Sequence, residues 1–174
     1  TCPCSYSVIA AKKLFLIPFF SWLLIAFGGL PINRDNRAEA IRSMESAARQ
    51  TLEGDCIIVS PEGTRSTTGQ LLPFKKGPLY LWENLNARVV PVIIFGAHEL
   101  CPPKTLISIT NTGRIYVRYL PTIERKEART RANMSKLVRR VMLEELKNAP
   151  KDTGGDISVI DHFASVVILI AIVA

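Results

Sequence analysis

A short loop near the middle of the chain carries side chains that could bind a phosphate. Residues 60–66 read Ser-Pro-Glu-Gly-Thr-Arg-Ser and follow the apolar stretch 55–60, which predicts a strand that stops at the proline. Gly63 permits a backbone conformation closed to other residues. Arg65 offers a planar fork of donors suited to phosphate, and Glu62 could orient this arginine or a ligand hydroxyl. The loop indicates a site for a phosphorylated ligand; a surface turn with a solvated ion pair is the alternative.

Three further stretches of the chain belong to the same pattern as this loop. Residues 28–34 read Gly-Gly-Leu-Pro-Ile-Asn-Arg, residues 74–77 after the loop read Phe-Lys-Lys-Gly, and residues 89–94 read Val-Val-Pro-Val-Ile-Ile. In their order and spacing these blocks resemble the glycerolipid acyltransferase family, membrane enzymes that acylate lysophosphatidic acid and related lysophospholipids. The resemblance covers residues 9–120. It departs from the family pattern at Ser60, usually aromatic, and at Pro31, usually apolar, and both departures look tolerable.

The resemblance implies a set of substrate-binding residues, which are Arg34, Glu62, Gly63, Thr64 and Arg65. Arg34 and Arg65 are expected to engage the phosphate of the acceptor by charge-assisted hydrogen bonds. Gly63 would let the backbone come close, while Glu62 and Thr64 would order the loop. The neighbouring Lys75 and Lys76 would add positive potential for phosphate or CoA. For Arg34, a loop ion pair with Asp35 is the alternative.

The implied reaction moves a fatty acyl group from acyl-CoA to a lysophospholipid hydroxyl. That hydroxyl is a weak nucleophile and needs a base, which the family supplies from a His-x-x-x-x-Asp block whose aspartate fixes the imidazole tautomer. His98 is followed five positions on by Pro103, and His162 by Val167, so the block is missing from this chain. In the family it would fall just upstream of Thr1, and the chain begins with Thr rather than Met.

From this absence we expect no catalytic residue in the chain, which we interpret as a fragment that is inactive alone. The implied chemistry needs no metal and no redox cofactor, with acyl-CoA as a co-substrate. A different class of function stays open, in which the chain is a non-catalytic phospholipid-binding or regulatory module. The coding sequence upstream would discriminate, because a His-x-x-x-x-Asp block there favours the enzyme.

Composition points to a membrane surface as partner. Hydrophobic residues make up 48% of the 174 residues, and the formal net charge is +7, which together favour an anionic lipid surface. Nucleic acid is the rival partner of a basic chain, but no zinc pattern, RNA-binding aromatic signature or glycine-rich RNA-binding loop is present. The four cysteines form no pair of Cys-x-x-Cys blocks, so no metal site is expected. The resemblance implies the endoplasmic reticulum or a related membrane.

Two apolar segments need a place in the fold. Residues 14–33 carry no charge, but Pro18 interrupts them and only residues 14–27 look helical. This segment could span a bilayer, and we favour a helix embedded in the membrane surface or packed on the domain. The twelve uncharged residues 163–174 are too few to span. Either they belong to a longer hydrophobic segment, or they pack against the N-terminal one.

The remaining pattern predicts an α/β domain with a mixed sheet flanked by helices. The expected elements are helices over 37–52, with Asn36 as N-cap and Glu39 completing a capping box, over 78–85 and over 124–149; strands over 56–60 and 88–95; and a hairpin of 107–110 with 114–120. The basic residues of the last helix are expected to form a solvated face. We place an acyltransferase domain at residues 1–150 and a linker with a hydrophobic tail at 151–174.

Overall fold

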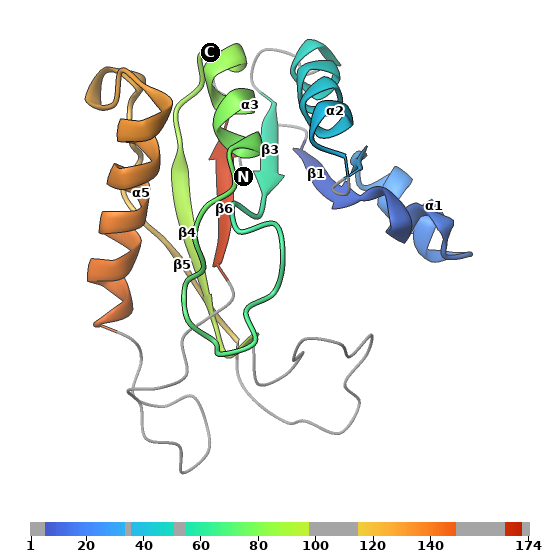
Figure 1. Cartoon of the computed structure of the whole chain (residues 1–174). Helices are drawn as coiled ribbons and strands as arrows, with labels where there is room; N and C mark the ends of the chain where they lie inside the picture. Colours follow the sequence, from blue (N-terminus) through green and yellow to red (C-terminus); the bar gives the residue numbers. More distant parts are fainter. Residues whose placement is uncertain (1–5, 34–35, 51–54, 98–114, 149–165, 172–174) are drawn as a thin grey trace.

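The structure, a computed structural model, describes residues 6–33, 36–50, 55–97, 115–148 and 166–171. Its elements are shown in Figure 1. In chain order they are β1 (Tyr6–Ala11), the 3-10 helix η1 (Lys12–Leu16), α1 (Phe20–Ala26), β2 (Gly29–Ile32), α2 (Arg37–Gln50), β3 (Cys56–Val59), α3 (Gly77–Leu85), β4 (Val90–Phe95), β5 (Tyr116–Tyr119), η2 (Arg125–Glu127), α5 (Arg131–Leu146) and β6 (Val166–Ala171).

The described strands form one mixed sheet of six strands in the order β2-β1-β3-β6-β4-β5. β1 runs parallel to β2 and to β3, whereas β6 is antiparallel to β3 and β4, and β5 is antiparallel to β4. Pro31 lies in β2, at the edge of the sheet, where a missing backbone N–H is tolerated. The predicted α/β class with a mixed sheet and flanking helices is confirmed.

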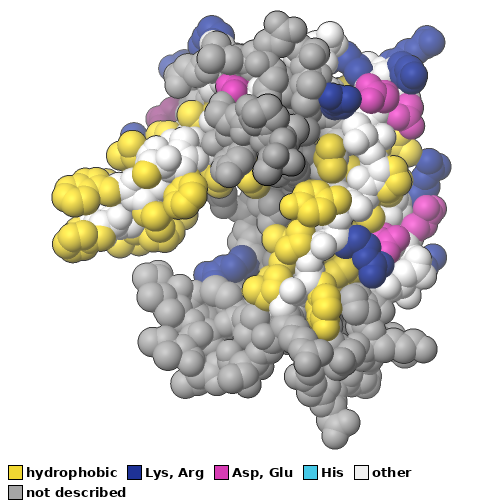
Figure 2. All heavy atoms as spheres, turned by 180° about the vertical axis from the view of Figure 1, so that it is seen from behind, with side chains coloured by type: hydrophobic (Ala, Val, Ile, Leu, Met, Phe, Trp, Pro, Cys, Tyr) yellow, Lys and Arg dark blue, Asp and Glu magenta, His cyan; other side chains and the backbone are white. Residues whose placement is uncertain are grey.

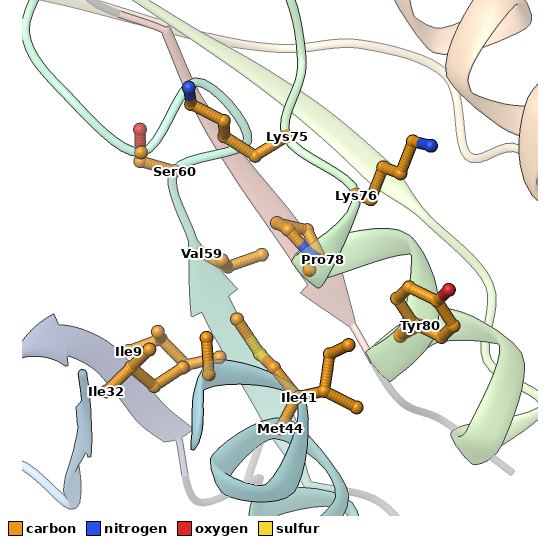
Figure 3. A pocket seen from close by; sticks show the side chains of 13 residues that line it. Ile9, Ile32, Ile41, Met44, Val59, Ser60, Lys75, Lys76, Pro78 and Tyr80 are labelled. Atoms are coloured by element: carbon orange, nitrogen blue, oxygen red, sulfur yellow. The ribbon is translucent and has the colours of Figure 1, made fainter. Parts of the chain in front are cut away.

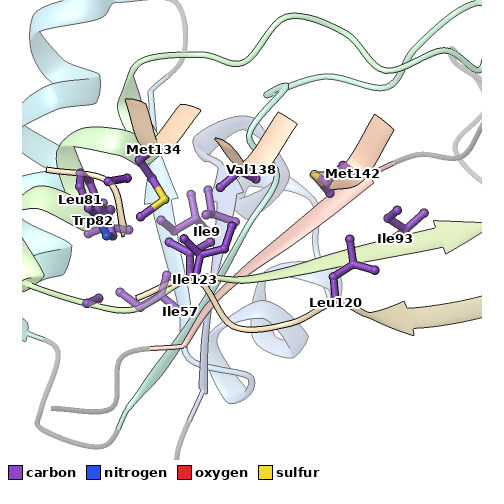
Figure 4. Packing of buried hydrophobic residues seen from close by; sticks show 14 of the residues in the cluster. Ile9, Ile57, Leu81, Trp82, Ile93, Leu120, Ile123, Met134, Val138 and Met142 are labelled. Atoms are coloured by element: carbon purple, nitrogen blue, oxygen red, sulfur yellow. The ribbon is translucent and has the colours of Figure 1, made fainter. Parts of the chain in front are cut away.

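Helices α2, α3 and α5 share one hydrophobic core with the sheet. Figure 4 shows α3 and α5 side chains meeting those of the strands. The most deeply buried members are Ile57, Leu81, Trp82, Ile93, Met134 and Met142. Because they come from the strands β3 and β4 as well as from α3 and α5, this core fixes the helices above the sheet and so positions the loops between them.

Local signals explain where α2 and α3 begin. The Asn36 side chain accepts hydrogen bonds from the backbone N–H groups of Ala38 and Glu39, over 3.0 and 3.3 Å, which confirms the predicted N-cap. Pro78 lies in the first turn of α3, where its missing N–H costs nothing. Met44 of α2 is buried against the core, whereas Ala38 in the first turn is exposed.

The apolar segment before β2 is not one continuous helix. A 3-10 turn ends at Leu16, the chain turns at Pro18, and α1 covers only residues 20–26. Proline lacks the N–H that an uninterrupted helix needs. α1 packs closely on the start of β2, since a Cβ on Gly29 would lie 2.6 Å from the carbonyl oxygen of Leu24. Within the described ranges, no helix has the length and apolarity needed to cross a bilayer.

The last helix starts later than predicted. Glu124 and Glu127 do form a capping box, but it caps the short η2. The chain then leaves the helical conformation, and α5 begins at Arg131 with the Thr130 hydroxyl accepting from the N–H of Asn133 over 3.2 Å. Two N-cap signals six residues apart therefore produce two helices where the periodicity predicted one.

Several predictions fall partly outside the described residues. The expected first arm of the hairpin, 107–110, lies there, and the second arm contains β5, which pairs with β4. Residues 166–171 of the C-terminal apolar segment form β6, between β3 and β4. The domain boundary at residue 150 stays a prediction, because 149–165 lie outside the described part.

We expect Met134→Ala to lower the free energy of unfolding by about 2–5 kcal/mol, because it would leave a cavity where a fully buried side chain now packs. Urea denaturation followed by circular dichroism measures the change. Leu143→Ala, on the same helix but with 41% of its side chain exposed, should change it by less than about 0.5 kcal/mol. Equal losses in the two variants would contradict the described packing of α5.

Candidate functional site

The loop after β3 is a closed turn at the carboxyl end of the strand. The N–H of Gly63 donates to the carbonyl oxygen of Ser60 over 3.2 Å, and the N–H of Lys75 donates to that of Pro61 over 2.7 Å. Gly63 has φ of 69°, and a Cβ there would lie 3.3 Å from Cγ of Lys75. Residues with a side chain rarely adopt this backbone conformation. Both the conformation and the limited space beside Lys75 therefore agree with the predicted need for glycine.

Glu62 faces the inside of the loop. Its side chain is only 3% exposed, and its Oε2 accepts a hydrogen bond from the backbone N–H of Leu72 over 2.9 Å. A carboxylate removed from water needs such partners to offset its lost hydration. The bond ties the first turn of the loop to its far side, ten residues along the chain, and so orders the loop. Binding of substrate by Glu62 stays a prediction.

An arginine of α5 holds the same part of the loop from the other side. Arg139 donates from Nη1 to the carbonyl oxygen of Leu72 over 2.7 Å and from Nη2 to that of Leu71 over 3.1 Å. Its guanidinium also lies 5.7 Å from the ring centre of Phe74. The predicted solvated face of this helix is therefore wrong for Arg139. A signal in the sequence was its helical position, next to the buried Val138 and one turn before Met142.

Arg125 and Arg131 also belong to the predicted solvated face, but both contact side chains of α3. Arg125 lies over the Trp82 ring at 4.9 Å and donates to the carbonyl oxygen of Glu83 over 3.1 Å. Arg131 lies 4.0 Å from the ring centre of Tyr80 and pairs with the Glu83 carboxylate over 3.2 Å. The other basic side chains expected on that face, Lys126, Arg129, Lys136 and Arg140, are exposed.

A pocket of about 420 Å³ opens beside the loop. Figure 3 shows its apolar walls, which come from three strands and from α2. The wall residues include Ile9, Ile32, Ile41, Met44 and Val59. Its polar end is formed by Ser60 and Gly63 together with Lys75 and Lys76. The pocket thus joins a deep apolar wall to a cationic rim, at the carboxyl ends of β1 and β3, where open α/β sheets bind ligands.

The structure brings only some of the predicted site residues to this pocket. Gly63, Lys75 and Lys76 line it, whereas Glu62 is buried in the loop and is not a lining residue. Two further predicted residues, Thr64 and Arg65, are exposed on the turn and are not among the lining residues. Arg34 lies outside the described residues, as do both histidines, His98 and His162. In the described part, no three acidic, cysteine or histidine side chains gather as a metal site.

Comparison with known proteins identifies the class. Residues 1–95 match the family model described as Acyltransferase, which covers the loop, the pocket-lining residues and β4. The chain belongs to this acyltransferase family. The resemblance noted from the three sequence blocks is thereby confirmed.

Relatives and a solved structure give a consistent picture. The chain is 37% identical over 91 residues to a 1-acyl-sn-glycerol-3-phosphate acyltransferase of Cocos nucifera, covering 52% of this chain and 30% of that protein. The enzyme of the same name from Saccharomyces cerevisiae is 34% identical over 124 residues, covering 70% and 40%. The crystal structure of the 1-acyl-sn-glycerophosphate (LPA) acyltransferase PlsC from Thermotoga maritima superposes with a TM-score of 0.65 at 26% identity, covering 85% of this chain and 59% of that one. The chain thus spans less than half the length of these two curated relatives.

We expect Arg139→Lys to lower the free energy of unfolding by about 1.5–3 kcal/mol, because lysine keeps the charge but cannot make both hydrogen bonds to the loop. Limited proteolysis should also cut residues 66–75 faster. The matched control is Arg140→Lys, an exposed neighbour on the same helix. If both variants keep wild-type stability and cleavage rates, Arg139 does not hold the loop.

Proposed function

We propose that this chain is the substrate-binding part of an enzyme that moves a fatty acyl group from acyl-CoA to the hydroxyl of a lysophospholipid such as lysophosphatidic acid, in phospholipid biosynthesis. The observation that carries the proposal is the pocket beside the Glu-Gly-Thr-Arg loop, with apolar walls and a lysine rim. Its volume of about 420 Å³ falls within the range of about 300–1,000 Å³ that ligand pockets span. The apolar walls match a fatty acyl chain, and the lysine rim matches a phosphate group beside it. The names of the relatives point to the same acceptor.

The acceptor phosphate would be held by Arg34 and Arg65. Each guanidinium can donate two parallel hydrogen bonds to phosphate oxygens. Gly63 has no side chain between its backbone and the pocket, so a ligand can approach there closely. Glu62 keeps the turn in shape through Leu72, and Thr64 stands beside it on the exposed side. Lys75 and Lys76 raise the local potential for an anionic ligand.

In the transfer step the acceptor oxygen bonds to the thioester carbonyl carbon, and the carbon–sulfur bond breaks. The hydroxyl proton passes to a base and then to the leaving thiolate, so the reaction balances without a metal or a redox cofactor. The chain contains no His-x-x-x-x-Asp block, and we assign the base to none of its residues. We therefore expect the 174-residue chain by itself to bind substrate without turning it over.

A second function follows from that missing block. If the intact protein also lacks a positioned base, the same pocket would serve a non-catalytic phospholipid-binding or regulatory module. Membership of the acyltransferase family supports the enzyme. The lack of a His-x-x-x-x-Asp block in this chain supports the binding module. Activity of the intact gene product separates them.

We propose a membrane location, the endoplasmic reticulum or a related membrane, supported by the exposed side chains of α1 and its flank. Figure 2 shows them as a protruding hydrophobic knob. Leu16, Phe19, Trp22, Leu23, Ile25 and Phe27 are each more than half exposed. Two exposed lysines, Lys12 and Lys13, precede the knob and suit an anionic lipid surface. A helix of this length would lie in the interface rather than cross it.

Acyl transfer from radiolabelled acyl-CoA to lysophosphatidic acid should be detectable in membranes that express the longest reading frame containing this chain. Glu62→Ala and Arg65→Ala should each lower kcat/KM at least about tenfold, because loop order and a charge-assisted phosphate contact are lost. Glu144→Ala and Arg42→Ala, two exposed side chains on helices, are the matched controls. Absence of transfer with retained binding of lysophosphatidic acid would favour the binding module.

Replacing Phe19 and Trp22 by serine should weaken binding to phosphatidylserine-containing vesicles by about 1.5 kcal/mol or more for each side chain, since 79% and 71% of these side chains are exposed and available for burial in lipid. Co-sedimentation with vesicles measures the loss, and Leu143→Ser is the control at an exposed leucine of α5. The emission of Trp22 should also shift to the blue on binding. Unchanged vesicle binding of the double variant would remove α1 as the contact.

A further inference from the structure

A second cavity lies beside the pocket, on the other side of α3. It is a groove of about 690 Å³ between α3 and the start of α5. Its charged lining residues are Lys76, Glu83, Arg129, Arg131 and Lys136, and its aromatic ones are Phe74 and Tyr80. Four cations face one carboxylate, so the groove carries an excess of positive charge. Both rings already contact arginines of α5, and they serve as walls of the groove.

The carboxylate of the groove is already matched within the protein. Glu83 pairs with Arg131 over 3.2 Å, and Arg131 also covers the face of Tyr80 at 4.0 Å. The other three cations, Lys76, Arg129 and Lys136, are exposed and make no ion pair in the described part of the chain. These three charges are therefore available to an anion that enters from solvent.

The groove and the pocket share part of their walls. Lys76 and Tyr80 line both cavities. In Figure 3 the ammonium group of Lys75 reaches toward Ser60, whereas the side chain of Lys76 and the hydroxyl of Tyr80 point to the opposite side. One ligand could then place an apolar arm in the pocket and a charged head in the groove, passing over Lys76.

We infer that this basic groove binds the phosphates of a nucleotide thioester, the CoA part of the acyl donor, while the acyl arm enters the apolar pocket. The inference rests on the proposed function for the nature of the donor. A head with several phosphates matches the three available cations of the groove. The head of a lysophospholipid, with a single phosphate, would leave most of these groups unused.

The test is isothermal titration calorimetry of the 174-residue chain with free CoA, which carries the head without the acyl arm. Arg129→Glu and Lys136→Glu should each raise the Kd for CoA about tenfold or more, because each replaces an attraction by a repulsion near phosphate. The matched control is Lys147→Glu, an exposed lysine after the end of α5 that lines neither cavity. Its effect should be less than about twofold at physiological salt, where distant charges are screened.

Further ligands identify what the groove recognises. Dephospho-CoA should bind more weakly than CoA and lose less affinity in the two groove variants. Lysophosphatidic acid should bind the groove variants as tightly as the wild type, and its binding should fall instead in Arg65→Ala. Thermal unfolding of each variant checks that the fold is kept, which is expected because both replaced side chains are exposed.

Three results would overturn the inference. The first is that the wild-type chain does not bind CoA. The second is that wild type and groove variants bind CoA with equal affinity. The third is that the groove variants lose as much affinity for lysophosphatidic acid as for CoA. None of these depends on turnover. A different result would count against the proposed reaction alone. In it, the intact gene product shows no acyl transfer, while the wild-type chain binds CoA and the two groove variants bind it more weakly; the groove would then remain a nucleotide site.

Discussion

The site depends on two opposite charges that hold one short stretch of backbone between them. Glu62 accepts a hydrogen bond from the N–H of Leu72, and Arg139 donates hydrogen bonds to the carbonyl oxygens of Leu71 and Leu72. The two side chains act through the same peptide groups. Removal of either would leave backbone groups and a charged side chain to find new partners in a partly buried place, which is costly. The shape of the loop is thus set jointly by the motif and by α5.

This arrangement extends the functional unit beyond the segment that the family model matches. Residues 1–95 contain the loop, but Arg139 and the arginines that hold α3 come from residues 125–139. α3 connects the matched segment with the residues that follow it. Its first turn lines the pocket, and its outer face is covered by Arg125 and Arg131. Any movement of α5 would therefore reach the rim of the pocket through α3 and through the loop.

The sequence predicted the elements whose signals are local. The N-cap at Asn36, the proline at the start of α3 and the apolar runs of β3 and β4 all lie next to the elements they define. The loop after β3 could be recognised as a motif because its glycine and charged residues are contiguous.

The remaining features depend on distant residues. The helical position of Arg139 places it beside the core, but its partner, a carbonyl oxygen 67 positions earlier, could not be predicted from the local sequence. The strand β2, with a glycine and a proline, reads as a loop until its place at the edge of the sheet is known. The apolar segment that contains β6 is too short for its role to be predicted from the sequence alone. Its pairing with β3 and β4 identifies it as a strand. The pocket itself could not be predicted, because its walls come from separate elements.

The knob formed by α1 has a consequence for how the protein behaves in solution. Its large apolar side chains stand out from a molecule whose net charge of +7 keeps copies apart. Added salt screens that repulsion within about a Debye length of 8–10 Å and leaves the apolar contact intact. The colloidal stability of the protein should accordingly fall as ionic strength rises, and dilute buffer or a mild detergent should keep it monodisperse where concentrated salt does not.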